Sequence, residues 1–218
     1  MVPGSEEDAI ALTLEAGDAE PFRALSVAWY VSGRSLAELF DGPVRRVMTA
    51  VGARWRDDEA AILAEHRATE VCAQAVPQLR MLMPPPADDA PLALGGAVEG
   101  DAHALASVMA AAVLAETGYR DVNFGGTTPV KLMSRAAAEQ RPRLVWLSVN
   151  TPPDARLVRG VEGLSEQLQR QGVPLVVGGI HAGALSAHGN MQVSRSMTEL
   201  SAFARGLLRA SGKRRGSS

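Results

Sequence analysis

Cysteine, aromatic residues and long apolar stretches are scarce in this sequence of 218 residues. Cys72 is the single cysteine, so the chain can form no internal disulfide, and we expect it in a reducing cytoplasm. No apolar run approaches the roughly 18 residues that a membrane-spanning helix needs. The first eight residues are acidic where a secretory signal would be basic. Export and membrane insertion are therefore not expected.

An excess of positive charge is also missing. The chain has 22 basic and 24 acidic residues, a formal net charge of −2, and this balance creates no field that would attract nucleic acid or an anionic membrane. Residues 5–20 contain six acidic side chains and no lysine or arginine. A basic recognition helix is thus absent from this segment, and we expect no direct binding to DNA.

The first part of the chain has the apolar spacing of helices. Between residues 5 and 82, apolar residues recur at steps of three and four, which predicts four or five short helices packed as a bundle over residues 1–83. Ser5 and Ser35 are expected helix caps, the second for a helix through Phe40, and Pro43 suits the first turn of the next helix. Residues 84–90 are rich in proline and form the predicted linker.

The second part alternates short apolar runs with longer helical patterns. The predicted strands are residues 92–97, 121–124, 144–148, 175–177 and 191–193, and the predicted helices are residues 102–117, 130–139, 155–171 and 197–208. This alternation is typical of a parallel sheet covered by helices on both faces. The predicted fold class is therefore an all-α bundle followed by an α/β domain over residues 91–212, a Rossmann-like doubly wound parallel sheet. Residues 213–218 are predicted to be a disordered basic tail.

Small and polar residues gather where three of these strands end. The first strand leads into a glycine-rich loop that contains Asp101 and His103, the third ends at Ser148, and the fourth ends in the pair Gly178 and Gly179. In open parallel sheets, ligands bind at this edge. A carboxylate beside a histidine can fix its tautomer and make the other ring nitrogen a better metal ligand.

The order of these features resembles the cobalamin-binding domain of methionine synthase, corrinoid carrier proteins and cobalamin-dependent mutases. Over residues 91–208, the resemblance implies that His103 is the lower axial ligand of cobalt and that Asp101 is its hydrogen-bond partner. It also implies that Ser148 lies near the nucleotide base and that Gly178 and Gly179 make room for the nucleotide tail, since glycine allows close approach of a ligand.

Two residues depart from that family's pattern. Ala106 stands where the family has a glycine, three residues after the histidine, and Asn150 stands where it has a leucine, two residues after the serine. We include Asn150 among the expected cofactor contacts. These departures leave room for an altered ligand, such as a bilin, in place of or beside cobalamin. His181 and His188, which follow the glycine pair, could line a ligand or belong to a surface loop.

The bundle carries a second motif, in which Trp55 is followed after nine residues by Glu65 and His66. At 100° per residue, Trp55 and His66 would return to nearly one face of a helix. Without context, these residues read as a core aromatic and a solvated pair. Beside a corrin-binding domain, they resemble the bundle of light-sensing adenosylcobalamin-dependent regulators of the CarH/LitR type. That resemblance implies that all three contact the upper ligand of cobalamin. Arg56 replaces a histidine that is frequent in those regulators and cannot serve as a normal metal ligand.

The leading hypothesis is a non-enzymatic light sensor without a DNA-binding domain. It would hold adenosylcobalamin between the bundle and the α/β domain and signal loss of the upper ligand to a separate protein partner or to its own oligomer. The alternatives are a corrinoid methyl carrier of a methyltransferase system, a module adapted to another tetrapyrrole such as a bilin, and an adaptor without a cofactor.

Overall fold

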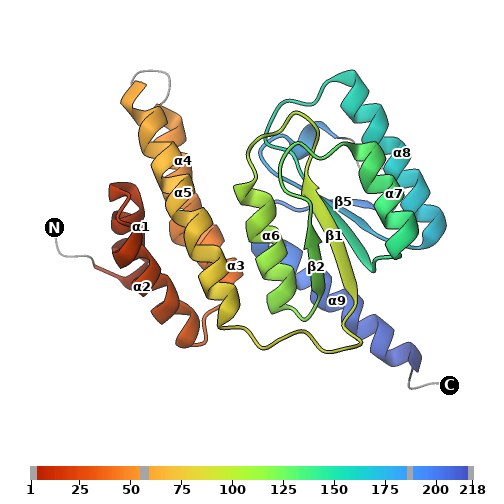
Figure 1. Cartoon of the computed structure of the whole chain (residues 1–218), viewed down its shortest axis with the longest axis horizontal. Helices are drawn as coiled ribbons and strands as arrows, with labels where there is room; N and C mark the ends of the chain where they lie inside the picture. The colour runs from red at the N-terminus through yellow and green to blue at the C-terminus, as the bar shows by residue number, and fades with distance from the viewer. Residues whose placement is uncertain (1–3, 55–58, 186–188, 216–218) are drawn as a thin grey trace. The chain divides into compact units, whose positions relative to one another are not determined.

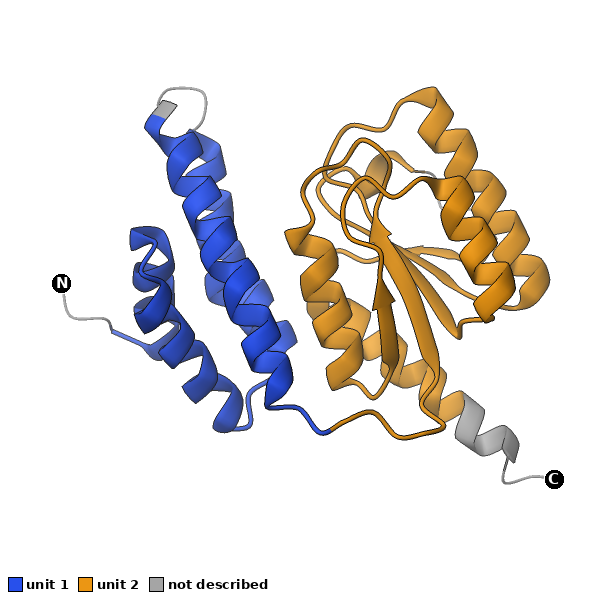
Figure 2. Cartoon of the chain, viewed as in Figure 1, with its two compact units in different colours: residues 1–84 blue, residues 85–218 orange. Residues whose placement is uncertain are grey.

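The computed structural model describes residues 4–54, 59–185 and 189–215, without the side chains of Glu59 and of residues 211–215. The chain divides into two compact units, Met1–Pro84 and Pro85–Ser218, and Figure 2 colours them separately. The division falls within the proline-rich segment, where consecutive prolines hold the backbone extended and cannot continue a helix. Each unit is described below by itself.

The first unit is entirely helical in its described part. Its elements are α1 (Glu6–Ala16), α2 (Ala19–Val31), α3 (Leu36–Leu39), the π-helical segment η1 (Phe40–Val44), α4 (Arg45–Ala53) and α5 (Glu59–Met81). The largest buried side chains of its core are Ile10, Leu14, Phe22, Trp29, Leu36, Leu39 and Leu79. The prediction of short helices is wrong for α5, which has 23 residues and continues through Pro77.

The predicted caps are present, whereas Pro43 has a different place. The Ser5 hydroxyl accepts the backbone N–H of Asp8, and Ser35 forms a reciprocal capping box with Glu38. Pro43 lies inside η1 rather than in the first turn of α4. Because proline lacks a backbone donor, the helix is interrupted there, and Gly42 takes the non-helical angles φ −85° and ψ −105°.

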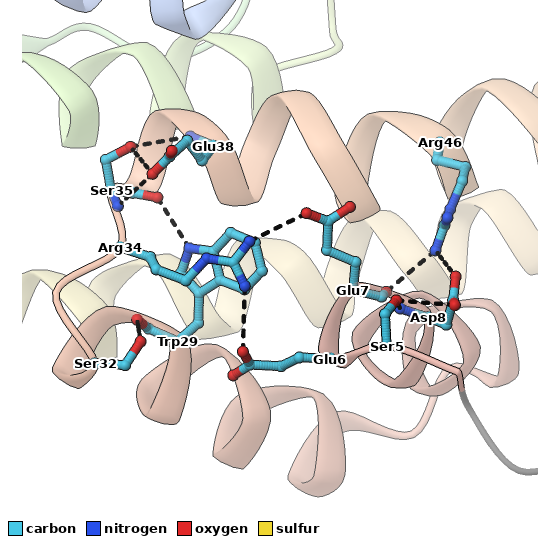
Figure 3. A network of polar contacts seen from close by, with 10 residues as sticks. All are labelled: Ser5, Glu6, Glu7, Asp8, Trp29, Ser32, Arg34, Ser35, Glu38 and Arg46. Carbon is cyan, nitrogen blue, oxygen red and sulfur yellow. Dashed lines mark hydrogen bonds and ion pairs between the residues drawn. The ribbon is translucent and has the colours of Figure 1, made fainter.

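A polar network ties the start of α1 to the turn between α2 and α3 (Figure 3). The Arg34 guanidinium lies 3.2 Å from the centre of the Trp29 ring and forms ion pairs with Glu6 at 3.2 Å and Glu7 at 3.1 Å. The Trp29 indole N–H donates to the backbone carbonyl of Ser35 at 3.0 Å. Two acidic side chains at the start of α1 are thus paired within the bundle unit by one arginine of the turn between α2 and α3.

The second unit is a parallel α/β sandwich. Its strands are β1 (Leu92–Ala97), β2 (Arg120–Asn123), β3 (Leu144–Ser148), β4 (Leu175–Gly178) and β5 (Met191–Val193). In the described residues they form one parallel sheet with the order β2-β1-β3-β4-β5. β1 and β3 are buried on both faces, as expected for central strands of such a sheet.

Helices cover both faces of this sheet (Figure 1). One face packs against α6 (Leu105–Glu116) and α9 (Met197–Arg215), and the other against α7 (Val130–Gln140) and α8 (Ala155–Gln171), while the 3-10 turn η3 (Ala182–Ala184) follows β4. The predicted doubly wound, Rossmann-like fold is confirmed. None of the described helices combines the length and apolar character needed to cross a bilayer.

In the α/β unit, two helix boundaries differ from the prediction by more than one residue. α6 begins at Leu105 rather than at residue 102, so His103 lies in a loop and not in a helical turn. α9 continues to Arg215, which places residues 213–215 in a helix where the sequence predicted a disordered tail. Lysine and arginine are good helix formers, and their positive charge is favourable at the C-terminal end of a helix dipole.

Candidate functional site

Three strand ends lie side by side at the carboxyl edge of the sheet. β1 ends at Ala97, β3 at Ser148 and β4 at Gly178, and the strand register pairs Ala97 with Ser148 and Ser148 with Gly178. The loops that follow therefore start next to one another. Asp101 in the first loop and Asn150 in the second come into contact, although 49 positions separate them in the sequence.

Asp101 is a fully buried carboxylate with four donors around it. Its Oδ1 accepts the backbone N–H of His103 at 3.0 Å and lies 3.1 Å from the ring Nδ1 of the same residue. Its Oδ2 accepts the backbone N–H of Asn150 at 2.6 Å and the side-chain Nδ2 at 3.2 Å. Burial of a charge is costly unless donors replace the lost water, and this set replaces it on both oxygens.

His103 presents its ring at the surface while Asp101 holds one side of it. The side chain is 57% exposed. A carboxylate can only accept hydrogen bonds, so the ring nitrogen facing Asp101, Nδ1, carries the proton. Nε2 then retains its lone pair and is available as a metal ligand. Asp101 thus lies within hydrogen-bond distance of the His103 imidazole, and the role of His103 as a cobalt ligand stays a prediction.

The loop around Asp101 is shaped by glycine. Gly100 has a φ of +82°, a conformation that side-chain-bearing residues rarely adopt, and it turns the chain directly before Asp101. The Asp101 backbone carbonyl accepts the N–H of Thr127 at 2.9 Å, and a Cβ on Gly126 would lie 3.3 Å from that carbonyl oxygen. The loop that follows β2 therefore also packs against the Asp101 turn.

A side-chain hydrogen bond joins Ser148 and Asn150, two of the residues expected to lie near the cofactor. The Asn150 Nδ2 donates to the Ser148 hydroxyl oxygen at 2.9 Å as well as to Asp101. Ser148 is 4% exposed, so its hydroxyl is covered by the protein. In this arrangement, both side chains belong to the hydrogen-bond network that supports His103.

The glycine pair at the end of β4 has a clear backbone role. Gly179 has a φ of +105°, and a Cβ at this position would overlap the backbone of Val149. A Cβ on Gly178, in contrast, would meet the Ser194 carbonyl at an ordinary 3.5 Å. The space next to Gly179 is thus filled by the β3 loop. His181 is anchored nearby, since its backbone N–H donates to the Val149 carbonyl at 2.9 Å.

The residues of the bundle motif are only partly covered by the structure. Trp55 and Arg56 lie outside the described residues, as does His188 of the α/β unit. Glu65 and His66 lie on α5, where the Glu65 carboxylate is 13% exposed and accepts the Thr69 hydroxyl at 3.0 Å. The His66 ring is 69% exposed, with its Nε2 3.8 Å from Glu65. These contacts form a carboxylate–imidazole pair within the bundle unit.

Sequence reasoning missed the loop after β2 and the exposed apolar residues at this edge. Phe124, after β2, is 40% exposed, and Ile180, after β4, is 84% exposed. The strand order places their loops on either side of the loops that carry His103 and Asn150. A cavity of about 350 Å³ adjoins the β2 loop and is lined by Phe124, Gly126, Thr127, Thr128, Pro129, Leu132 and Met133. The Gly125–Gly126 pair directly after a strand was the signal that could have indicated this loop.

The donor set limits what His103 could bind. Among the residues that the structure describes, no group of three or more His, Cys, Asp or Glu side chains is placed to hold a metal ion. A single imidazole at a sheet edge suits a metal that brings most of its ligands with it, as in a macrocycle. The fold and the site therefore define an α/β unit that presents the exposed His103 imidazole, held by a buried carboxylate, at the carboxyl edge of its sheet.

Comparison with known protein families identifies the macrocycle class. Residues 91–192 match a family model described as a B12 binding domain, and residues 4–80 match a second model with the same description. The chain carries two B12-binding domains and is a cobalamin-binding domain protein. A search of the curated proteins found no match.

Three solved structures resemble this one. The monomethylamine corrinoid protein of Methanosarcina barkeri has a TM-score of 0.69 at 16% identity, over 91% of this chain and 96% of that chain. The methanol:cobalamin methyltransferase complex MtaBC of the same organism has a TM-score of 0.47 at 15% identity, over 94% and 80%. A cobalamin-binding protein of Desulfitobacterium hafniense has a TM-score of 0.46 at 18% identity, over 95% and 97%. At these identities the likeness concerns the fold, and the light-sensing family stays a prediction.

Proposed function

We propose that this chain binds cobalamin with His103 as the lower ligand and carries a methyl group for a separate methyltransferase. One observation carries the proposal: on a B12-binding domain, the buried Asp101 carboxylate holds Nδ1 of an exposed histidine and leaves its Nε2 available. The similar fold of a monomethylamine corrinoid protein supports the carrier function. This places the alternative of the sequence analysis ahead of the light sensor.

The chain's own residues would supply binding and orientation. Asp101 fixes the His103 tautomer and, as a buried negative charge, increases the electron donation of the ring through Nε2. Phe124 and Ile180 offer apolar surface on neighbouring loops, which suits the apolar parts of a corrin ring. When bound, cobalamin supplies a cobalt ion that accepts and releases a methyl group. The transfer itself would be catalysed by the partner enzyme.

Isotope labelling tests the ligand assignment directly. The protein is produced with ¹⁵N-histidine, loaded with hydroxocobalamin and reduced to the Co(II) state, whose electron paramagnetic resonance lines are split by the axial nitrogen. A protein imidazole gives doublets with ¹⁵N, whereas the cofactor's own base gives triplets. We expect doublets that are lost in His103→Ala and kept in His181→Ala. Triplets in the labelled wild-type protein would exclude His103 as the ligand.

The carrier function needs a test of its own. The protein is loaded with methylcobalamin and mixed with a purified cobalamin-dependent methyltransferase and its thiol acceptor, and methyl transfer is followed by the loss of the methylcobalamin spectrum. We expect faster transfer than from the same concentration of free methylcobalamin, and a lower rate with His103→Ala. Equal rates from protein-bound and free methylcobalamin with every methyltransferase tried would contradict the proposal.

The light sensor is the second candidate, because the spacing of Trp55, Glu65 and His66 resembles that of the light-sensing regulators. In the part of the motif that the structure describes, the His66 Nε2 lies 3.8 Å from the Glu65 carboxylate on α5. A sensor loaded with adenosylcobalamin in darkness should change both its spectrum and its elution volume after green light, whereas a methyl carrier should change its spectrum alone. The bilin alternative predicts red absorption after incubation with biliverdin. The Asn150 amide already donates hydrogen bonds to Asp101 and Ser148, so this residue does not specifically favour the bilin alternative.

A further inference from the structure

Asn150 holds the second oxygen of the Asp101 carboxylate, and no other side chain is seen to do so in the described residues. Its backbone N–H lies 2.6 Å and its Nδ2 lies 3.2 Å from Oδ2, while Oδ1 serves His103. The same Nδ2 donates to the Ser148 hydroxyl at 2.9 Å, which fixes the orientation of the amide. A fully buried carboxylate is thus shared between the imidazole and one asparagine.

The number of donors to Asp101 affects the imidazole because all of them bind to the same negative charge. Each N–H bound to Asp101 withdraws negative charge from the group and weakens its hold on the remaining donors. Removing the Nδ2 donor concentrates that charge on the Nδ1–H of His103. The backbone N–H of Asn150 stays in any variant, so the carboxylate keeps one partner on Oδ2.

We propose that Asn150 is a positioning residue that sets how strongly Asp101 holds the His103 ring, and thereby how strongly Nε2 donates to a bound metal. This inference rests on the proposed function for its consequence at cobalt, but not for the hydrogen bond itself. A leucine at this position, which the family resemblance predicts, offers no donor. The asparagine therefore distinguishes this chain by weakening the lower ligand.

The hydrogen bond can be measured in the cofactor-free protein. Proton and ¹⁵N nuclear magnetic resonance of the His103 ring reports the position of the Nδ1 proton, its exchange with water and the tautomer. In Asn150→Leu and Asn150→Ala, we expect the Nδ1 proton to move downfield and to exchange more slowly than in the wild type. Two variants of different size separate the loss of the donor from a change in packing.

Asn190→Ala is the matched control, since it removes a side-chain amide that donates to the backbone carbonyl of Val173 rather than to Asp101. We expect its Nδ1 signal to match the wild type. An unchanged Nδ1 signal in both Asn150 variants, with circular dichroism showing that they are folded, would overturn the proposal. So would equal shifts in Asn190→Ala and Asn150→Leu.

The cobalt-bound form gives a separate readout. In the Co(II) resonance experiment, the nitrogen splitting from His103 should be larger in Asn150→Leu than in the wild type. If cobalamin does not bind through His103, this splitting is absent while the resonance of the cofactor-free ring still reports on Asn150. The failure of the cobalamin proposal and the failure of the asparagine proposal are thus distinguishable.

Discussion

Replacement of Asp101 by asparagine tests the buried carboxylate at the centre of the site. Asparagine keeps the size of the side chain but exchanges one acceptor oxygen for an NH2 group. Each oxygen of Asp101 receives two N–H donors, from His103 on one side and from Asn150 on the other. Whichever way the new side-chain amide is oriented, its NH2 group therefore faces two N–H donors and cannot accept a hydrogen bond from either.

The magnitude follows from which of these donors can find another partner. The His103 ring is 57% exposed and can turn to water, and the Asn150 Nδ2 keeps its bond to Ser148. One backbone N–H is left without an acceptor in either orientation, at about 1–3 kcal/mol, and a charge-assisted bond is lost as well. We expect Asp101→Asn to lower the free energy of unfolding by about 2–4 kcal/mol.

Urea unfolding of the cofactor-free chain, followed by circular dichroism and tryptophan fluorescence, measures this loss. Asp154→Asn is the matched control. Asp154 caps α8 through the backbone N–H of Leu157 at 2.7 Å and is exposed, and asparagine is about as good a cap, so a change within about 0.5 kcal/mol is expected. If Asp101→Asn is as stable as this control, the four hydrogen bonds do not stabilise the fold as argued.

Three further predictions concern other parts of the molecule. Gly179→Ala should lower the free energy of unfolding in urea by about 2–4 kcal/mol, because Gly179 has a φ of +105° and a Cβ there would overlap Val149. For Gly172→Ala, the matched control with a φ of +67° and open space around it, we expect a loss of only about 1 kcal/mol. Ser26 is fully buried and its hydroxyl has no hydrogen-bond partner among the described residues. Ser26→Ala should therefore increase the free energy of unfolding by about 1 kcal/mol and raise the melting temperature. A melting temperature below that of the wild type would contradict the absence of a partner. Burial raises the pKa of Cys72 to about 12, so iodoacetamide should not label the native protein at pH 8. The free energy of unfolding should fall as the pH rises from about 9 towards 12, because the thiol ionises in the unfolded chain before it does so in the folded one.

The sequence predicts the fold of the α/β unit well because its signals are local and repeated. Short runs between turn-forming residues predicted all five strands to within one residue of the structure, as at Leu144–Ser148. Boundaries failed where tertiary packing overrides local preference. The predicted start of α6 came too early because a turn built on Asp101 precedes it. α5 continues through the exposed Pro77 while Val76 and Leu79, on either side of it, are buried in the bundle core.

The candidate site was predictable as far as strand ends could place it. Asp101 and His103 are two positions apart, so a shared turn could bring them together whatever the rest of the chain does. Asn150 was predicted as a cofactor contact because it follows Ser148 in the loop at this edge of the sheet. Its hydrogen bond to Asp101, in contrast, depends on the alignment of β1 with β3. No local pattern encodes that alignment, and the role of Asn150 followed from the structure alone.

The arrangement also explains why a carboxylate, rather than a neutral acceptor, suits the position of Asp101. A neutral side chain could fix the His103 tautomer, but its single acceptor oxygen has two lone pairs, too few for the four donors of the β1 and β3 loops. The negative charge strengthens all four bonds, and burial keeps water from screening it. The energy that holds the two loops together therefore comes from the same group that orients the imidazole. A change that weakens the contact between the loops should also loosen the ring, so the stability of this edge and the geometry of the lower ligand should vary together across variants of Asp101 and Asn150.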